Sequence, residues 1–320
     1  MKEAVITIQA RGQLYTPVIA DEILLERGRI GTPAKLTFRV LVDEVILFWE
    51  GDLVTLRMGE RILFSGFVFS KRRQAGSPIT VVAYDQLRYL KNRDSYSYEN
   101  LTATGLIRRI AADTGLVLGD LAETEYVLEP RVENGRSLFD MIQTTLDLTE
   151  QRTGELFVLY DEAGQLRLSH VRQLLLDTLV YSGSAADFDY TSSIDRGVYT
   201  AVKLERANGA EEEPTVYRAM DDDLVRRWGW LQLTGRVGDD EDGAEAAKTL
   251  LKLHARKARR VVVTDAAGDL RVMGGSLLPV RLDLGDVFVD ELLIVDFVRH
   301  RISENGHVMD LTLSGGEIVA

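Results

Sequence analysis

Apolar and polar residues alternate in short runs along the first part of the chain, up to Tyr84. Alternation of this kind, interrupted by glycine and proline, is typical of half-buried β-strands. We therefore predict strands at residues 3–9, 23–27, 34–41, 52–58, 61–73 and 78–84. Their spacing predicts a small β-barrel or β-sandwich.

Residues 51–92 contain three of these strands, and their order predicts a β-meander that ends in a short helix. Gly59 begins a tight reversal, since glycine adopts a positive φ at little cost. Gly66 interrupts a run of bulky residues, which indicates either a bulge or a close approach of another backbone segment. Asp85 is a good N-cap for a helix over residues 86–92.

The period of the apolar residues changes after Asn100, where helical spacing replaces alternation. Thr102 and Ser137 are the expected N-caps of two helices, and Gly115 ends the first of them. A hairpin is expected within residues 155–171, around the turn sequence Asp-Glu-Ala-Gly. These features predict a helix-plus-hairpin insert.

The remainder of the chain returns to short β-like runs. Strands are predicted at residues 198–206, 215–220, 230–234, 261–265, 278–282, 287–289, 292–301 and 307–313. One long helix is predicted at about residues 239–260, because this segment begins with acidic residues and ends with basic ones, as the helix dipole favours.

Together these elements predict a β-rich α+β protein in which two β-barrel or β-sandwich domains flank the insert. An N-terminal β-barrel-like domain is expected at residues 1–92 and an α+β insert domain at residues 93–176. A second β-barrel-like domain, with the long helix, is expected at residues 177–320. A chain of 320 residues is long enough for each β-rich half to have its own core.

The composition is that of an acidic globular protein with a formal net charge of −12. This charge argues against specific nucleic-acid binding, although an acidic protein could line a channel through which nucleic acid slides. No apolar run is long enough to cross a bilayer, and the first residues lack the pattern of a secretory signal. The chain has no cysteine, which excludes disulfides and fits assembly in a reducing cytoplasm.

Residue patterns typical of catalysis or metal binding are absent from the sequence. The histidines are His170, His254, His300 and His307, and they form no HExxH motif. No phosphate-binding loop or serine-hydrolase motif occurs, and the acidic residues 239–242 fit a helix start better than a calcium loop. Sugar cleavage by paired carboxylates stays open, because an acidic chain offers many pairs. We predict no catalytic, cofactor-binding or metal-binding residues and no cofactor.

Aromatic and basic residues provide the candidates for a subunit or partner interface, which are Trp49, Lys71, Arg72, Arg73, Trp228 and Trp230. The basic tract 71–73 is either a solvated strand end that discourages edge pairing or one side of a salt bridge to an acidic neighbour. The tryptophans lie beside expected turns, as core corners or as interface anchors. The apolar run 45–49 is either a strand edge or a turn that packs on a partner.

Four tracts within residues 51–116 carry a family resemblance: GDLVTLRMG, ILFSGFVFSKRR, ITVVAYDQLRYLKN and TATGLIRRIAADTGL. They resemble the XkdQ/YqbQ-type tail proteins of phages and defective prophages. Those proteins are similar to late control protein D and to the trimeric baseplate hub of contractile-tailed phages. The tract AYDQLRYLKN is the most specific part, and the resemblance extends more weakly through most of the chain.

The resemblance implies a non-enzymatic structural hub in a contractile phage tail or a phage-tail-like bacteriocin, assembled in the bacterial cytoplasm. In that family, two barrel domains of tail-tube type give a homotrimer a pseudo-sixfold ring. The implied partners are the tail tube protein, the central spike protein, the tape-measure protein and the baseplate wedge proteins. A closed ring would also cover strand edges, among which we expect the apolar run 292–298.

Two alternatives come from other functional classes. The first is a tail-associated peptidoglycan hydrolase, against which the lack of a spare domain of enzymatic size counts. The second is a free-standing β-rich binding module on a cell surface, against which the lack of a signal segment counts.

Overall fold

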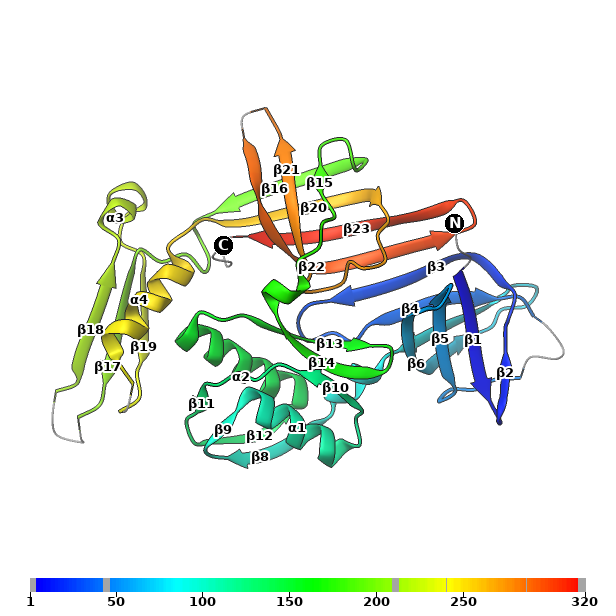
Figure 1. Cartoon of the computed structure of the whole chain (residues 1–320), viewed down its shortest axis with the longest axis horizontal. Helices are drawn as coiled ribbons and strands as arrows, with labels where there is room; N and C mark the ends of the chain where they lie inside the picture. Colours follow the sequence, from blue (N-terminus) through cyan, green and yellow to red (C-terminus); the bar gives the residue numbers. More distant parts are fainter. Residues whose placement is uncertain (1–3, 43–46, 209–212, 240, 286, 316–320) are drawn as a thin grey trace.

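The computed structural model describes residues 4–42, 47–208, 213–239, 241–285 and 287–315 (Figure 1). Strands predominate, which confirms the predicted β-rich α+β class. In Figure 1 the N-terminal strands lie at the right, the insert below the centre and the C-terminal strands above it. A small sheet with one covering helix lies at the left.

The N-terminal half contains every strand predicted for it. Its strands are β1 Ala4–Ala10, β2 Gln13–Tyr15, β3 Ile19–Gly28, β4 Lys35–Val40, β5 Leu53–Met58, β6 Arg61–Arg72 and β7 Ile79–Tyr84. The predicted meander is the antiparallel series β5, β6 and β7. In β4, Leu36, Phe38 and Val40 are buried and the residues between them are half exposed, as the two-residue period of a strand requires. The short β2, which was not predicted, pairs with β1.

Gly66 lies in the middle of β6, opposite Val54 of β5. A Cβ at this position would overlap the carbonyl oxygen of Tyr84 in β7 and would lie 2.6 Å from the ring of Phe64. The register shifts of β6 fall on either side of Gly66. The close backbone approach, rather than a bulge, is therefore the reason for glycine here.

The meander ends in the 3₁₀ helix η1, Gln86–Lys91, which confirms the short helix predicted there. The predicted N-cap, Asp85, accepts a hydrogen bond from the backbone N–H of Leu87. Its second oxygen accepts from the N–H of Ala34 at 3.0 Å. One carboxylate thus caps the helix and ties it to the β3–β4 turn.

The insert contains two helices and a hairpin, as predicted. Its elements are β8 Arg93–Tyr98, β9 Leu101–Thr102, α1 Ala103–Thr114, β10 Leu118–Leu121, β11 Val127–Leu128, β12 Arg131–Ser137, α2 Leu138–Thr153, β13 Phe157–Glu162, β14 Gln165–His170 and η2 Val171–Leu174. Thr102 and Ser137 cap α1 and α2, and Gly115 ends α1 with a left-handed backbone. The strands from β8 to β12 were not predicted, because short polar strands such as Arg-Asp-Ser-Tyr-Ser-Tyr carry no clear apolar period.

The C-terminal half contains a small inserted sheet. Its elements are β15 Val180–Tyr181, β16 Asp187–Ser193, β17 Ala201–Arg206, β18 Thr215–Met220, α3 Asp222–Trp228, β19 Gln232–Arg236, α4 Gly243–His254, β20 Ala258–Ala267, β21 Leu277–Asp283, β22 Phe288–Ser303 and β23 Gly306–Gly315. The strands β17, β18 and β19 form a separate sheet, and α4 packs on it. We call β17 to α4 the small-sheet module.

The long helix predicted at residues 239–260 is wrong in length. Helix α4 spans only Gly243–His254, and Asp242 caps it by accepting from the N–H groups of Ala244 and Glu245. The basic residues expected in its last turn, Arg259 and Arg260, lie in β20 instead. They precede a run of valines that pairs with both β16 and β23. This pairing stabilises a strand more than the interaction of basic residues with a helix dipole would stabilise a helix.

The two β-rich halves share one sheet. Strand β3 pairs with β22 in antiparallel fashion, with Leu25 opposite His300. The main path of the sheet runs β16-β20-β23-β22-β3-β4-β7-β6-β5-β1-β2. The apolar run 292–298, expected at a strand edge, lies in β22, which pairs with β21, β23 and β3. That expectation is wrong for the run from Ile294 onward, because β23 pairs with it on one side while β21 and then β3 pair with β22 on the other.

Four larger apolar cores underlie this architecture. They belong to the N-terminal strands, the insert, the C-terminal strands and the small-sheet module. Ile302 of β22 packs in the N-terminal core, so the first core also depends on the last part of the chain. The domain boundaries after residues 92 and 176 stay predictions, and a separate core in the small-sheet module was not predicted.

Candidate interaction surfaces

Trp49 and Lys71, two of the predicted interface residues, lie together at one end of the N-terminal half. The ammonium of Lys71 lies 4.1 Å from the ring centre of Phe48 and 6.0 Å from that of Trp49. Arg11, in the β1–β2 turn, lies 4.0 Å from the ring centre of Trp49. Phe48 is buried, whereas Trp49 is 39% exposed. Trp49 is thus held at the surface by cation–π contacts.

Arg72 and Arg73 are exposed at the end of β6. Strand β5 pairs with β6 only as far as Phe67, whereas β7 pairs with it as far as Arg72. The basic residues thus lie at a solvated strand end with a strand partner on one side, which agrees with the first of the two interpretations. Residues 45 and 46 of the apolar run lie outside the described residues, and residues 47–49 belong to no strand.

The other two candidates lie in the small-sheet module. Trp228 is the last residue of α3 and is half-buried, and Trp230 is 57% exposed. Figure 1 places α3 at the opposite side of the molecule from β1 and β2. The structure therefore separates the six candidates into two groups, and their role at an interface stays a prediction.

Sequence reasoning missed a buried charged cluster where three parts of the chain meet. Arg27 of β3, Asp85 before η1 and Asp161 of β13 line one cavity of about 20 Å³. Met273 and Gly274, from the C-terminal half, complete its wall. Asp85 belongs to the AYDQ sequence, but the sequence alone indicated only its capping role.

The environment of this cluster changes the proton affinity of its carboxylates. Burial and the nearby charge of Asp161 raise the pKa of Asp85 well above its usual range. Burial also raises the pKa of Asp161, and it lowers the pKa of Arg27. Arg27 donates a hydrogen bond to the carbonyl oxygen of Leu63, and within the described part of the chain its Nε has no partner. Burial therefore opposes the charged form of all three side chains, whereas the charge of Arg27 favours the ionised form of both carboxylates.

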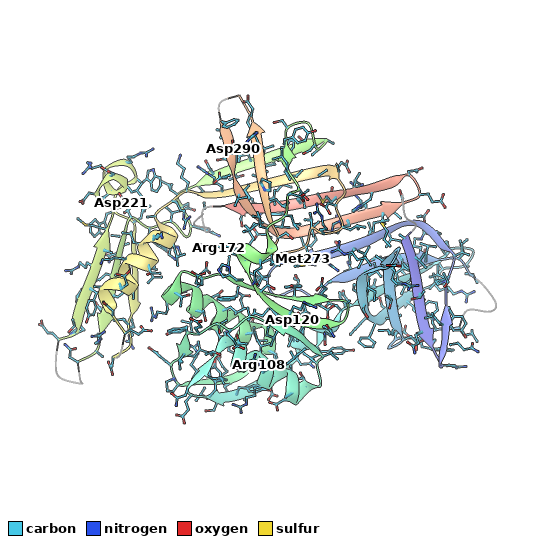
Figure 2. The ribbon with its side chains drawn as sticks, viewed as in Figure 1. Arg108, Asp120, Arg172, Asp221, Met273 and Asp290 are labelled. Atoms are coloured by element: carbon cyan, nitrogen blue, oxygen red, sulfur yellow. The ribbon has the colours of Figure 1, made fainter. Side chains whose placement is uncertain are left out.

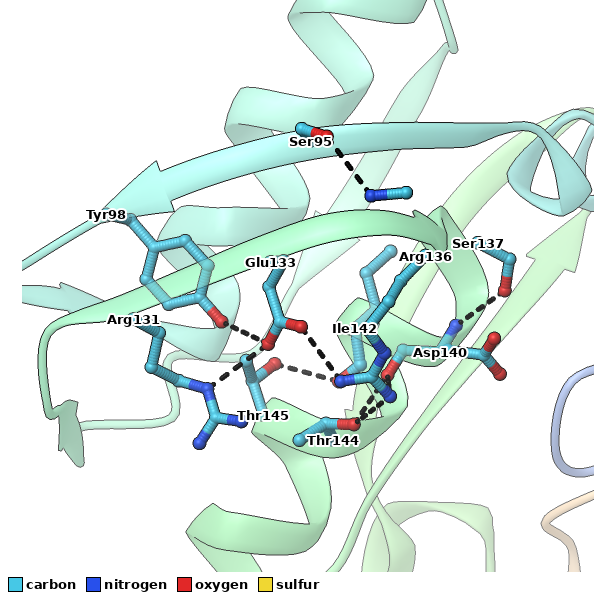
Figure 3. Close-up of polar contacts among 11 residues, drawn as sticks. Ser95, Tyr98, Arg131, Glu133, Arg136, Ser137, Asp140, Ile142, Thr144 and Thr145 are labelled. Carbon is cyan, nitrogen blue, oxygen red and sulfur yellow. Dashed lines mark hydrogen bonds and ion pairs between the residues drawn. The ribbon is translucent and has the colours of Figure 1, made fainter.

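A second charged cluster lies on β12, the strand that pairs with β8 (Figure 3). Glu133 accepts hydrogen bonds from Arg131 Nε at 3.1 Å and from Arg136 Nη1 at 2.8 Å. Burial alone would raise the pKa of Glu133, but the hydrogen bonds from Arg136 and Arg131 outweigh it and lower that pKa. The buried carboxylate is thus ionised and paired, which is a structural rather than a catalytic arrangement.

Glu241 connects the small-sheet module to the insert. Its Oε1 accepts from the hydroxyl of Tyr126 at 2.8 Å and from Nε of Arg152 at 2.9 Å. Its Oε2 accepts from the N–H of Gly238. Burial and the hydrogen bond to Glu241 raise the pKa of Tyr126 to about 12.

Two of the four histidines form a pair between β22 and β23. Nδ1 of His300 lies 3.0 Å from Nε2 of His307, and Nε2 of His300 lies 2.9 Å from the carbonyl oxygen of Val272. A carbonyl only accepts, so Nε2 of His300 carries the hydrogen and Nδ1 accepts from His307. Burial and the neighbouring His307 lower the pKa of His300 to about 3, and burial also lowers the pKa of His307.

The described residues contain no group of three or more His, Cys, Asp and Glu arranged to hold a metal ion. Within the same residues, no helix combines the length and the apolar character that crossing a membrane requires. The predictions that the chain has no catalytic residue, metal or cofactor stay predictions.

The chain is similar in sequence to a curated phage-element protein. It is 28% identical over 312 residues to the phage-like element PBSX protein XkdQ of Bacillus subtilis, with 93% of each chain covered.

Solved structures share the fold. The 43 kDa tail protein of prophage MuSo2 from Shewanella oneidensis matches with a TM-score of 0.67 at 15% identity, covering 97% of this chain and 98% of that one. The c3393 protein of E. coli, a component of the type VI secretion system, matches with a TM-score of 0.56 at 12% identity, covering 97% of this chain and 75% of that one. The YQBQ-like family model matches residues 23–314, so the chain belongs to the YQBQ-like family.

Proposed function

We propose that this protein is the structural baseplate or tail hub of a contractile phage tail or a phage-tail-like bacteriocin, where it joins the tail tube to the central spike. The observation that carries the proposal is the correspondence, over nearly the whole chain, to a phage-element protein in sequence and to a prophage tail protein in fold. Every part of the architecture is included in that correspondence, so the proposal concerns the whole chain.

The shared sheet suits a subunit of a ring. Because β3 pairs with β22 along six residue pairs, the two β-rich halves are joined by main-chain hydrogen bonds rather than by a linker. A ring of three such chains would present six β-rich halves to a sixfold tail tube. We therefore include a homotrimer in the proposal.

The proposed partners are the tail tube protein, the central spike protein, the tape-measure protein and the baseplate wedge proteins. The c3393 protein is described as structurally similar to the T4 tail proteins gp27 and gp5, which supports a place in an injection apparatus. We further propose that the chain joins the particle in the bacterial cytoplasm and remains in its baseplate.

We propose that the protein works without catalysis. Purified protein should leave peptidoglycan, casein and a panel of glycosides intact. Turnover that disappears when one Asp or Glu is changed to Ala would favour a tail-associated hydrolase instead. Recovery of the chain on cell surfaces and not in particles would favour a free-standing binding module.

Image reconstruction of intact tails tests the hub role directly. We expect three copies of this chain at the junction of tube and spike. Six copies, or a position in the outer wedges or the sheath, would contradict the proposal.

A further inference from the structure

Exposed aromatic residues occur on two surfaces of opposite charge that lie in different parts of the chain. The first, which we call the cationic end, consists of Arg11, Trp49, Lys71, Arg72 and Arg73. The second, which we call the acidic hairpin, consists of Tyr181, Asp283, Phe288 and Asp290. We propose that the cationic end of one copy docks on the acidic hairpin of the next copy, in an interface that rests on the proposed role as a ring-forming hub.

The acidic hairpin is one face of strands β21 and β22. Its register pairs Asp283 with Phe288 and Arg281 with Asp290, so these side chains project from the same face. Tyr181 of β15 lies beside Arg281 and extends this face. Residues of the opposite face, such as Leu282 and Val289, are buried in the C-terminal core.

Phe288 is the reason to regard this face as a docking surface. Its side chain is 64% exposed, Leu284 in the adjoining turn is exposed as well, and exposed Tyr181 lies on the same face across β21. The carboxylates of Asp283 and Asp290 are also exposed, although Arg281 lies 3.3 Å from Asp290. An exposed aromatic residue within a polar rim is typical of an interface anchor. Figure 2 shows Asp290 on the hairpin that projects at the top of the molecule.

The cationic end has the complementary chemistry. Trp49 supplies an exposed aromatic ring, and Arg11 and Lys71 are already held against that ring. Arg72 and Arg73 add exposed positive charge beside them. Residues 1–92 contain more Lys and Arg than Asp and Glu, whereas the whole chain has a net charge of −12. The remainder of the chain therefore carries all of the acidic excess, and the N-terminal half of one copy attracts the C-terminal half of another.

The charges also restrict the symmetry of the contact. A contact of the cationic end with the cationic end of another copy would place like charges against each other across the interface. A reciprocal twofold contact would pair each cationic end with an acidic hairpin but would close on two copies, so a hub of three copies requires the heterologous contact, with Arg72 opposite Asp283 and Trp49 opposite Phe288. Heterologous contacts form a ring when the rotation closes, which is the arrangement that a hub requires.

The surface around Trp230 is the other candidate partner. Asp221, Asp222 and Asp223 lie at the start of α3, but Arg226 and Arg227 follow on the same short helix, and Asp223 and Arg226 form an ion pair. Acidic and basic side chains nearly balance there, as Asp290 and Arg281 do on the hairpin. We assign the docking role to the acidic hairpin because Phe288 is more exposed than Trp230 and has the carboxylate of Asp283 opposite it.

Cross-linking through introduced cysteines tests the proposal, because the chain has none of its own. Leu47 and Leu284 are exposed beside the two aromatic anchors and can be changed without removing them. Intact particles carrying Leu47→Cys and Leu284→Cys in one chain should give covalent products of up to three chains with a short bismaleimide. The matched control is Leu47→Cys with Val132→Cys, since Val132 of β12 is 80% exposed and belongs to neither surface.

The control pair and each single variant should stay monomeric on denaturing gels. Dimers from Leu47→Cys alone would indicate a twofold contact and would overturn the proposal. Particles that contain the chain but give no product from the 47–284 pair would also overturn it. Particles that lack the chain would contradict the proposed function instead, and the same cross-linking on concentrated purified protein would then decide whether the two surfaces bind each other.

Charge-reversal variants test whether the two surfaces bind each other or only lie close together in the particle. Arg72→Glu and Asp283→Lys should each reduce the cross-linking yield of the 47–284 pair by about fivefold, because each places like charges across the interface while the contacts of Lys71 with the aromatic rings are kept. Both changes in one chain should restore the yield, since the opposite charges then face each other in exchanged positions. Equal losses in the single and double variants would overturn the pairing of these two residues.

Discussion

Oε1 of Glu241 accepts a hydrogen bond from Nε of Arg152 at 2.9 Å, although the two residues are 89 positions apart. Arg152 lies in the last turn of α2, and Glu241 lies just before α4. The side chains are only 13% and 21% exposed. A pair shielded from water interacts more strongly than a surface pair, so this contact holds the small-sheet module on the insert.

A double-mutant cycle should detect this pair. We expect Arg152→Ala and Glu241→Ala to be coupled by about 1.5–3 kcal/mol in the free energy of unfolding, the magnitude of a hydrogen bond to a charged group. The matched control is Lys248 with Glu245 on α4, an exposed pair at 3.4 Å that should have no measurable coupling. Urea unfolding of the single and double variants provides the measurement. Equal coupling energies for the two pairs would contradict the anchoring role.

Gly66→Val should destabilise the N-terminal half. The added side chain would collide with the backbone of Tyr84, which cannot move without breaking the pairing of β6 with β7. We expect a loss of about 3 kcal/mol in the free energy of unfolding, at the upper end of overpacking effects. The matched control is Ser70→Val on the same strand, where the side chain is exposed and valine suits a β-strand. Comparable losses at both positions, measured by thermal unfolding, would mean that the close approach is unimportant.

The histidine pair should make stability decrease in acid. His300 has a pKa of about 3 in the folded protein, against an ordinary value of 6.5. The unfolded chain therefore binds a proton that the folded chain does not, and stability is lost as pH falls below 6.5. We expect a contribution of about 2 kcal/mol at pH 5, which unfolding at pH 8, 6.5 and 5 would reveal.

His300→Gln provides the discriminating variant for this pH dependence. Glutamine can still donate to the carbonyl of Val272 but does not titrate, so the slope of stability against pH should become shallower. An unchanged slope in His300→Gln would assign the acid sensitivity to other groups.

The stability of the protein should depend on the balance of charges in the buried cluster of Arg27, Asp85 and Asp161 more than on any one of these residues. Arg27→Met leaves two buried carboxyl groups without the nearby cation that favours their ionised form, and we expect a loss of about 3–5 kcal/mol. Adding Asp161→Asn should recover part of that loss, because a single carboxyl group then remains in the cluster and the repulsion between the two is removed. Denaturant unfolding of the two variants provides the measurement. A double variant that is less stable than Arg27→Met alone would contradict the charge-balance account.

Local features were predictable wherever a few neighbouring residues are sufficient to form them. Asp85, Thr102 and Ser137 each cap the helix that follows, because a side-chain oxygen beside free N–H groups acts within one turn. The strands of the meander were predictable for the same reason, since one face of each is buried and the period is visible in the chain. The prediction of one helix over residues 239–260 was wrong because the basic residues at its end suit either a helix end or the start of a strand. The pairing with β16 and β23, which are distant in sequence or follow later in the chain, places these residues in a strand.

The candidate surfaces also combine features that the sequence indicates with features that only the tertiary structure decides. The sequence by itself offered the tryptophans and the basic tract 71–73 as candidates, since their residue types suit an interface, but it left open whether the tryptophans are buried or exposed. Only the tertiary structure brought Trp49 to Lys71 and Arg11, and only strand register placed Phe288 beside Asp283. The pairing of β3 with β22, which joins the two halves, also depends on residues more than 250 positions apart. Such contacts depend on chain closure and register, which no local pattern encodes, whereas caps and strand periods depend on neighbours within a few residues.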